Sequence, residues 1–206
     1  ITAKAFAVVD LDKEIVLLQK DTDTLFPIAS ITKLVTAVVA DNLFKENKYI
    51  EINSNILAYN GSSAHFKIGE KFTPQELLYP LLMVSSNDSA EALAQSYGRK
   101  NFIKEMNNFV NKIGAYKTYF VDPSGLSPQN VSTVSDLVII MKWIIDHKPE
   151  IINITLLKSK EIKIHTWTNP THFLNLSAYS GGKNGYLPEA LRTSVSLWRL
   201  GKDKRL

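Results

Sequence analysis

The sequence predicts an α+β fold in which an antiparallel sheet from both chain ends is flanked by helices and carries an inserted helical lobe. Two observations favour this fold: β-like runs occupy the beginning and the end of the chain, and amphipathic helical patterns fill the middle. We expect one domain, with a sheet lobe at residues 1–29 and 155–206 and a helical lobe at 47–150. A buried helix at 30–46 lies between the lobes.

Composition bounds the class of protein. The chain has 206 residues, is 45% hydrophobic and contains no cysteine, which excludes disulfides and thiol catalysis. No run of about 18 apolar residues is present, so we expect no transmembrane helix. The net charge of +4 is compatible with peripheral association with an anionic membrane or wall. No cluster of Lys and Arg is interleaved with aromatic residues, so we expect no nucleic-acid partner.

The first elements read as a hairpin. Residues 3–10 and 14–19 are apolar runs joined by Leu11-Asp12-Lys13. The first ten residues therefore read as a strand rather than as a signal peptide, and for an exported protein we expect this sequence to be a mature or shortened form.

The helix predicted from Ser30 to about Lys45 is apolar on more than one face, so we expect it to be buried. Ser30 and Lys33 lie one turn apart, which lets the amine reach the hydroxyl. Burial lowers the pKa of a lysine, and a neutral lysine can activate a serine nucleophile. The helix N-terminus offers unpaired N–H donors to an oxyanion. The same pair also fits a simpler interpretation, an N-cap serine beside a lysine whose amine extends to water.

The helical lobe is predicted from capping signals. Thr73-Pro74-Gln75-Glu76 is a capping box with Pro at the first helical position. The expected elements of this region are β-like runs at 49–52 and 56–59, a helix from Thr73, a helix ending near Gly98, a helix capped by Asn101 and ended by Gly114, and a helix opened by Ser135 or Asp136 and closed before Pro149.

The C-terminal region is predicted to be β-rich. We expect strands at 161–166 and 192–200 and a glycine-rich turn at 180–182. A second S-x-x-K sequence, Ser180-Gly181-Gly182-Lys183, contains two glycines that argue against a helix there.

Two further motifs follow Ser30-x-x-Lys33 in order: Ser85-Ser86-Asn87 between two predicted helices, and Lys183-Asn184-Gly185 at a predicted strand. Acyl transfer by serine needs a base, a proton path and an oxyanion hole. Ser85 can relay a proton, Asn87 can hold a substrate amide, and Lys183 can place charge near a carboxylate. Each motif alone also has a structural interpretation, because Ser and Asn are common at helix boundaries and K-x-G occurs three times.

In this order, the three motifs resemble those of the low-molecular-mass penicillin-binding proteins, the serine D-alanyl-D-alanine carboxypeptidases of the S-x-x-K class. The resemblance covers nearly the whole chain. It is carried by Ala7-Val8-Val9-Asp10, Pro27-Ile28-Ala29-Ser30-Ile31-Thr32-Lys33-Leu34-Val35-Thr36-Ala37, Leu81-Leu82-Met83-Val84-Ser85-Ser86-Asn87-Asp88-Ser89-Ala90, Asp122-Pro123-Ser124-Gly125-Leu126 and Gly182-Lys183-Asn184-Gly185-Tyr186.

The resemblance implies a role for each site residue. Ser30 would be the acylated nucleophile and Lys33 its base, with Ser85 as the third catalytic residue. The backbone N–H groups of Ser30 and Tyr186 would form the oxyanion hole. The other implied substrate-binding residues are Asn87, Lys183, Asn184 and Gly185.

The implied reaction removes the terminal D-alanine from peptidoglycan stem peptides through an acyl-enzyme, and β-lactams would acylate the same serine. No metal and no cofactor are implied. Such an enzyme works on the outer side of the bacterial membrane, in the periplasm or the wall.

The sequence departs from the family pattern in two places. Asn184 stands where the family has the threonine of K-T-G, which weakens the expected recognition of a substrate carboxylate; Arg192 is a nearby candidate for that contact. The chain also ends soon after its last predicted strand. Relatives usually continue with another strand, and a missing strand would leave a sheet edge unprotected.

Four alternatives stay open. A D,D-endopeptidase uses the same machinery, and an inactive penicillin- or wall-binding module is favoured by Asn184. A class A β-lactamase needs a Glu to activate water, and no E-x-x-L-N-like segment lies between Ser85 and Lys183. A Ser–His–Asp hydrolase is disfavoured because no G-x-S-x-G is present, and the four histidines form no H-E-x-x-H pattern.

Overall fold

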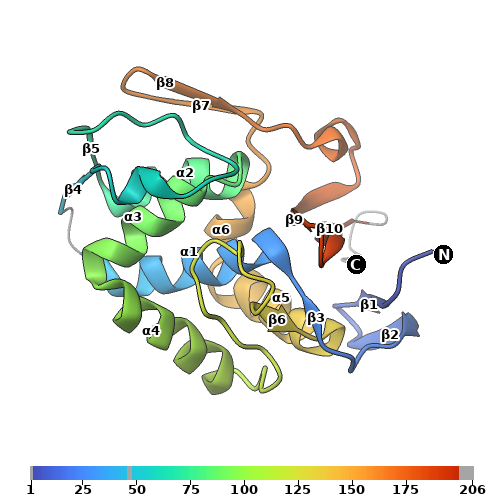
Figure 1. Cartoon of the computed structure of the whole chain (residues 1–206). Coiled ribbons are helices and arrows are strands. Elements are labelled where there is room, and N and C mark those ends of the chain that lie inside the picture. The colour runs from blue at the N-terminus through green and yellow to red at the C-terminus, as the bar shows by residue number, and fades with distance from the viewer. Residues whose placement is uncertain (1, 46–47, 200–206) are drawn as a thin grey trace.

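The computed structural model describes residues 2–45 and 48–199 as a mixture of helices and antiparallel strands (Figure 1). The helices are α1 (Thr32–Leu43), α2 (Pro74–Met83), α3 (Asn87–Tyr97), α4 (Arg99–Lys112), α5 (Val134–His147) and α6 (Pro149–Ile154), with 3₁₀ turns η1 (Ala29–Ile31), η2 (Ile56–Ala58) and η3 (His172–Asn175).

The strands pair antiparallel, two by two: β1 with β2, β3 with β6, β4 with β5, β7 with β8 and β9 with β10. Their bounds are β1 (Phe6–Asp10), β2 (Ile15–Lys20), β3 (Phe26–Pro27), β4 (Ile50–Glu51), β5 (Lys71–Phe72), β6 (Val131–Ser132), β7 (Ser159–Ile162), β8 (His165–Thr168), β9 (Tyr179–Leu187) and β10 (Leu191–Trp198).

The α+β class is confirmed, with strands contributed by both chain ends and helices inserted between them. The sheet itself differs from the expectation in one respect. Within the described residues the hairpins β1–β2 and β9–β10 lie on the same side of the molecule (Figure 1), but no strand of one pairs with a strand of the other. The predicted positions 46 and 200–206 lie outside the described residues.

Helix α1 forms the centre of the molecule. Every residue from Thr32 to Ala40 is buried, as the apolar pattern on more than one face predicted. Helices α2, α3, α4 and α6 all contact α1, with α2 and α3 on one side and α4 on the other (Figure 1). The nucleophile candidate therefore sits at one end of the best-packed element of the fold.

Local signals predicted some helix ends correctly. The Thr73 capping box is confirmed, since Thr73 Oγ1 accepts from Glu76 N and the Glu76 carboxylate accepts from Thr73 N. Gly114 follows α4 with a φ of +91°, which glycine adopts without strain. The predicted cap at Asn101 is wrong, because α4 already begins at Arg99 after Gly98.

Two other local predictions are wrong. Helix α5 is capped by Thr133, whose hydroxyl accepts from Asp136 N, rather than opened by Ser135 or Asp136. Residues 56–58 form a 3₁₀ turn, not a strand. The predicted end of α5 before Pro149 is confirmed, because the helix ends at His147; Pro149 then occupies the first position of α6, where its missing N–H costs nothing.

The predicted turn at Ser180–Gly182 is also wrong, because these residues lie inside β9. Gly181 and Gly182 have no Cβ, which allows neighbouring segments to pack closely against β9. A Cβ on Gly182 would lie 2.2 Å from the carbonyl oxygen of Val195, and one on Gly181 would lie 2.5 Å from Ile152 Cγ2.

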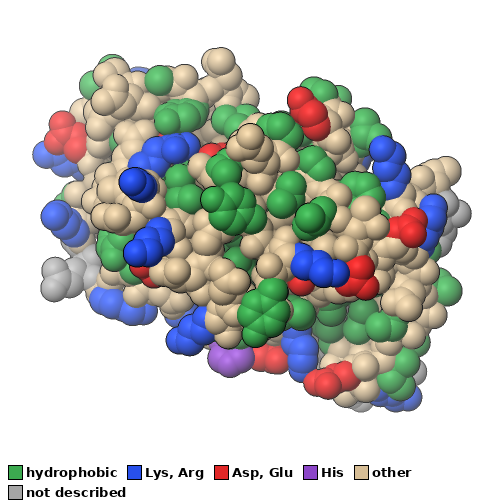
Figure 2. All heavy atoms as spheres, turned by 60° about the horizontal axis from the view of Figure 1, so that its bottom comes forward, with side chains coloured by type: hydrophobic (Ala, Val, Ile, Leu, Met, Phe, Trp, Pro, Cys, Tyr) green, Lys and Arg blue, Asp and Glu red, His purple; other side chains and the backbone are tan. Residues whose placement is uncertain are grey.

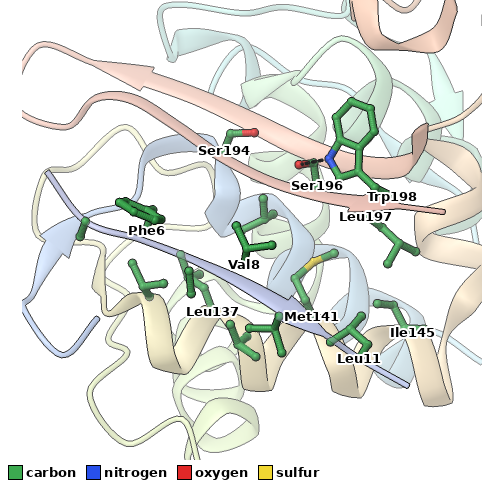
Figure 3. Close-up of a pocket in the computed structure, with 16 residues that line it drawn as sticks. Phe6, Val8, Leu11, Leu137, Met141, Ile145, Ser194, Ser196, Leu197 and Trp198 are labelled. Carbon is green, nitrogen blue, oxygen red and sulfur yellow. Dashed lines mark hydrogen bonds between the residues drawn. The ribbon is translucent and has the colours of Figure 1, made fainter. Parts of the chain in front are cut away.

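An apolar groove of about 310 Å³ separates β1 from β10 (Figure 3). Helix α5 forms its floor through Leu137, Met141 and Ile145, while Val8 and Leu197 project from the two sides. The facing edges of β1 and β10 have no strand partner among the described residues. The groove thus occupies the space between the two terminal hairpins, which do not form one sheet.

The surface shown in Figure 2 carries Lys and Arg side chains that are scattered among acidic and apolar groups rather than gathered into one strip. Strand β2 leaves Ile15, Val16, Leu17 and Leu18 about half exposed. Within residues 2–45 and 48–199, no helix has the length and apolar character required to span a membrane.

Candidate active site

The candidate nucleophile lies in a 3₁₀ turn rather than in the helix proper. Ser30 is the middle residue of η1, and α1 begins at Thr32. The preceding Ala29 has a φ of +49°, a region that residues with a Cβ rarely adopt. The turn nevertheless preserves the expected spacing, and the Nζ of Lys33 lies 3.0 Å from the Oγ of Ser30. The predicted approach of amine and hydroxyl is therefore confirmed.

Lys33 is completely buried, and its amine contacts two further acceptors. Its Nζ lies 2.8 Å from Asn87 Oδ1 and 2.5 Å from the backbone oxygen of Ser124. A protonated amine can donate to both and to Ser30, but a neutral amine has two N–H bonds and one lone pair. Because the two carbonyl oxygens can only accept, the lone pair of neutral Lys33 is left for the Ser30 hydroxyl.

The surroundings favour the neutral form of that amine. Burial holds the pKa of Lys33 well below its usual value, the positive charge of Lys183 lowers it further, and the carboxylate of Asp122 opposes both. Burial also lowers the pKa of Lys183, to about 8. Lys33 is thus placed and tuned as a proton acceptor, while Lys183 keeps its charge in neutral solution.

The second motif lies between α2 and α3. Ser85 has a φ of +62°, a strained conformation that recurs at functional sites, and Ser86 caps α3 by accepting from Ser89 N. Asn87 is buried, and its amide nitrogen donates to the carbonyl of Asn60 at 2.7 Å. This bond fixes the amide orientation, so that Oδ1 of Asn87 faces Lys33.

The third motif lies on β9, which packs against η1. Lys183 and Gly185 share one face of the strand, and a Cβ on Gly185 would lie 2.7 Å from the backbone nitrogen of Ser30. On β10, Thr193 donates to the carbonyl of Ile28 at 3.0 Å and holds the hairpin to the nucleophile turn. Only glycine allows this approach of β9 to Ser30.

The side chains of Asn184, Tyr186 and Arg192 lie on the opposite, exposed face of the hairpin. Asn184 pairs across the strands with Ser194, and Tyr186 pairs with Arg192. The Oδ1 of Asn184 accepts from the Ser194 hydroxyl at 2.7 Å. The structure therefore brings Ser30, Lys33, Asn87, Lys183 and Gly185 together but does not place these three side chains among them.

Sequence reasoning missed the loop that completes the surroundings of Lys33. Asp122-Pro123-Ser124-Gly125-Leu126 was noted only as a stretch that carries the family resemblance, with no role in the site, yet Ser124 supplies an acceptor for the amine. Thr36, one turn after Lys33, donates to the carbonyl of Pro123 at 2.6 Å. A Cβ on Gly125 would lie 2.0 Å from the carbonyl oxygen of Ala29. The acceptor is a backbone carbonyl, which is the same in every residue, so no side chain in the sequence indicates it. The only available signal was the Asp-Pro-Ser-Gly-Leu run itself.

Asn130 ties this loop to α1. Its Oδ1 accepts from the backbone nitrogens of Val121 and Asp122, and its Nδ2 donates to Thr32 Oγ1 and to the carbonyl of Asp122. The side chain is completely buried and uses its full bonding capacity.

This arrangement supports serine acyl transfer by a lysine base. It places a nucleophile at a helix end, a buried amine in contact with it, and a second cation on the neighbouring strand. Across the described residues, no group of three or more His, Asp and Glu side chains has the arrangement of a metal site.

The comparisons with known proteins agree with this chemistry. The model of the Peptidase S11 family, described as D-alanyl-D-alanine carboxypeptidase, matches residues 1–198. A D-alanyl-D-alanine endopeptidase of Escherichia coli is 34% identical over 171 residues, which are 81% of this chain and 54% of that protein. A D-alanyl-D-alanine carboxypeptidase of a Streptomyces species is 31% identical over 199 residues, 83% of this chain and 67% of that one.

Solved structures show the same fold. A Streptomyces DD-transpeptidase variant superposes with a TM-score of 0.90 at 28% identity, over 100% of this chain and 88% of that one. A Mycobacterium tuberculosis D-alanyl-D-alanine carboxypeptidase gives 0.90 at 29% identity, over 98% and 80%. The chain spans about half the length of the first curated relatives that it matches, 41–54%.

The buried amide of Asn130 generates a stability prediction. Asn130→Ala leaves its four partners without a bond, so we expect a loss of roughly 3 kcal/mol in the free energy of unfolding, measured in urea. The control is Asn111→Ala, which removes one exposed bond to Asn107 and is expected to cost less than about 0.5 kcal/mol. Equal losses in the two variants would contradict the role given to Asn130.

Proposed function

This chain belongs to the Peptidase S11 family of D-alanyl-D-alanine carboxypeptidases, and we propose that it is itself a serine D,D-carboxypeptidase of peptidoglycan stem peptides. The observation that carries the proposal is the buried Lys33 amine, 3.0 Å from Ser30 Oγ and bonded to two acceptors that leave its lone pair for that hydroxyl.

We propose the following acylation step. Ser30 Oγ attacks the carbonyl carbon of the penultimate D-alanine, and the proton of the Ser30 hydroxyl passes to Lys33 Nζ. The backbone N–H groups of Ser30 and Tyr186 stabilise the oxyanion. Collapse of the intermediate breaks the peptide bond, and the proton held by Lys33 passes through the Ser85 hydroxyl to the amine of the leaving D-alanine, which leaves Lys33 neutral again. Water then hydrolyses the ester and restores Ser30.

The remaining predicted residues serve substrate binding in this proposal. Asn87 faces the site from α3 and holds a substrate amide, while Gly185 allows the peptide backbone to approach β9. Lys183 supplies the charge that attracts the terminal carboxylate. Asn184 and Arg192 remain candidates for the same contact, and to make it their side chains would have to leave the exposed face of the hairpin.

A D,D-endopeptidase is the second candidate. Three curated relatives, 34–38% identical, are named D-alanyl-D-alanine endopeptidases. The placement of Asn184 and Arg192 also favours it, because an endopeptidase cuts between two peptides and needs no strong grip on a free carboxylate at the scissile end.

The setting of the enzyme follows from its family. Cell-wall peptidases of this family generally act outside the cytoplasm, and we propose the periplasm or the wall side of the membrane, with peripheral attachment supported by the net charge of +4. We further propose that the sheet lobe at 1–29 and 155–206 and the helical lobe at 47–150 work as one catalytic domain around the helix at 30–46.

Acylation by a penicillin tests the nucleophile. We expect the intact mass of the wild-type protein to increase by the mass of the drug, because the ring-opened β-lactam stays bound as an ester. The Ser30→Ala variant is expected to show no increase. Drug hydrolysis without an adduct would indicate a β-lactamase, and neither adduct nor hydrolysis would support a binding module.

The acylation rate is expected to depend on pH in a bell shape. The rate rises with pH as Lys33 loses its proton and becomes a base, and it falls near pH 8 as Lys183, whose pKa burial lowers to about 8, loses the charge that attracts the drug carboxylate. The measurement is the second-order acylation rate between about pH 5 and 10. In Lys183→Arg the alkaline decline should disappear, because arginine keeps its charge. A flat wild-type profile would exclude Lys33 as the base.

Two substrates separate carboxypeptidase from endopeptidase. We expect release of D-alanine from a stem pentapeptide, measured by chromatography, to exceed conversion of a cross-linked dimer to monomers. Arg192→Ala should change both activities by less than about twofold, because the Arg192 side chain lies on the exposed face of the hairpin, opposite to Lys183 and Gly185. Faster cleavage of the dimer than of the pentapeptide would establish the endopeptidase instead.

A further inference from the structure

Asp122 is a buried carboxylate whose bonds are made almost entirely within its own loop. It is 7% exposed, and its Oδ1 accepts from Ser124 N at 2.7 Å, Ser124 Oγ at 2.8 Å and Gly125 N at 2.7 Å. Its Oδ2 accepts from Ser127 N at 2.8 Å. The ion pairs of the described residues do not include Asp122, so N–H and O–H donors make its direct contacts, while the charge of Arg99 interacts with it over a longer distance.

These bonds fold the loop at 122–127 onto the nucleophile turn. Consecutive residues of the loop then meet α1 and η1: the carbonyl of Pro123 accepts from Thr36, and the carbonyl of Ser124 accepts from Lys33. Gly125 lies directly against the carbonyl of Ala29. The carboxylate of Asp122, together with Asn130 on the Asp122 backbone, therefore sets the position of the acceptor that orients the Lys33 amine.

The charged groups that face Lys33 come from two directions. Lys183 on β9 lowers the pKa of Lys33, and Asp122 in the loop raises it; the other contacts, from Ser30, Asn87 and the Ser124 carbonyl, are uncharged. Asp122 is thus the one anion among these named neighbours, and its removal favours the neutral amine.

We propose that Asp122 is a positioning residue for the Lys33 base, which holds the Ser124 carbonyl against the amine and keeps one negative charge beside it. The inference rests on the proposed function, in which neutral Lys33 accepts the proton of Ser30. It assigns Asp122 two separable effects. The hydrogen bonds of Asp122 raise the maximal acylation rate, because they hold the loop so that the lone pair of Lys33 is directed at Ser30. The negative charge of Asp122 raises the pH at which Lys33 loses its proton and the lone pair becomes free.

The test is Asp122→Asn, assayed by the pH dependence of acylation by a penicillin. We expect the acid side of the profile to move to lower pH, because loss of the anion favours neutral Lys33. We expect the maximal rate to fall roughly tenfold or more, because the amide nitrogen cannot accept from Ser127 N and the loop shifts. Asp122→Glu keeps the charge, so its acid side should stay near the wild-type position while its maximal rate falls.

The matched control is Asp136→Asn. Asp136 is also buried, at 6% exposure, and accepts from Lys117 N and Thr118 Oγ1 at 2.8 Å, but its charge is not among those that shift the pKa of Lys33. This variant should lose stability without moving the acid side of the profile. If Asp122→Asn behaves in the same way, Asp122 is merely structural and the inference is wrong.

Failure of the proposed function is distinguishable from failure of this inference. A wild-type protein that forms no adduct on Ser30 at any pH refutes the function. A wild-type protein that is acylated, beside an Asp122→Asn profile that keeps the wild-type acid side, refutes only the role of Asp122. If Asp122→Asn does not fold, Asp122→Glu tests both effects. A pH profile whose acid side moves to lower pH, although the charge is retained, overturns the electrostatic effect. A maximal acylation rate equal to that of the wild type overturns the positioning effect.

Discussion

The burial of one lysine amine organises the candidate site. Among the described residues, Lys33 is one of the largest side chains that are completely buried, and it lies in α1, on which α2, α3, α4 and α6 pack. An amine in this position is stable only if its N–H bonds find acceptors and its charge is weakened. Asn87 and the Ser124 carbonyl supply the acceptors, and the lone pair that remains is directed at Ser30. The contacts that satisfy the buried amine are therefore the same ones that leave its lone pair facing the Ser30 hydroxyl.

Two residues beside these contacts have a strained backbone. Ala29 and Ser85 both have positive φ, and they stand directly before the nucleophile and within the second motif. Neither conformation is favourable by itself, so the surrounding packing must hold it. The loop at 122–127 packs on Ala29 through Gly125, and β9 packs on Ser30 through Gly185. Two glycines thus allow two segments to approach the nucleophile turn from different sides.

The groove between β1 and β10 shows how little the site depends on a continuous sheet. Strand β9, which carries Lys183 and Gly185, is held to the nucleophile turn by the bond from Thr193 to Ile28 and by its packing on η1. The hairpin β1–β2 lies beyond the groove and contacts α5 instead. The third motif is thus positioned by the β9–β10 hairpin and its contacts with η1.

The sequence by itself determined the elements that depend on neighbours along the chain. The α+β order, the buried character of α1, the capping box at Thr73 and the Ser30–Lys33 spacing all follow from periodicity and local hydrogen bonding. Tertiary structure decided the rest. The Ser180–Gly182 segment is a strand because its glycines fit against Ile152 and Val195. The register of β9 with β10 sets the side chains of Asn184 and Arg192 on the outer face. Ser124 contributes to the site through its backbone oxygen. Such contacts join residues far apart in sequence, and a backbone carbonyl is the same in every residue, so no local pattern records them.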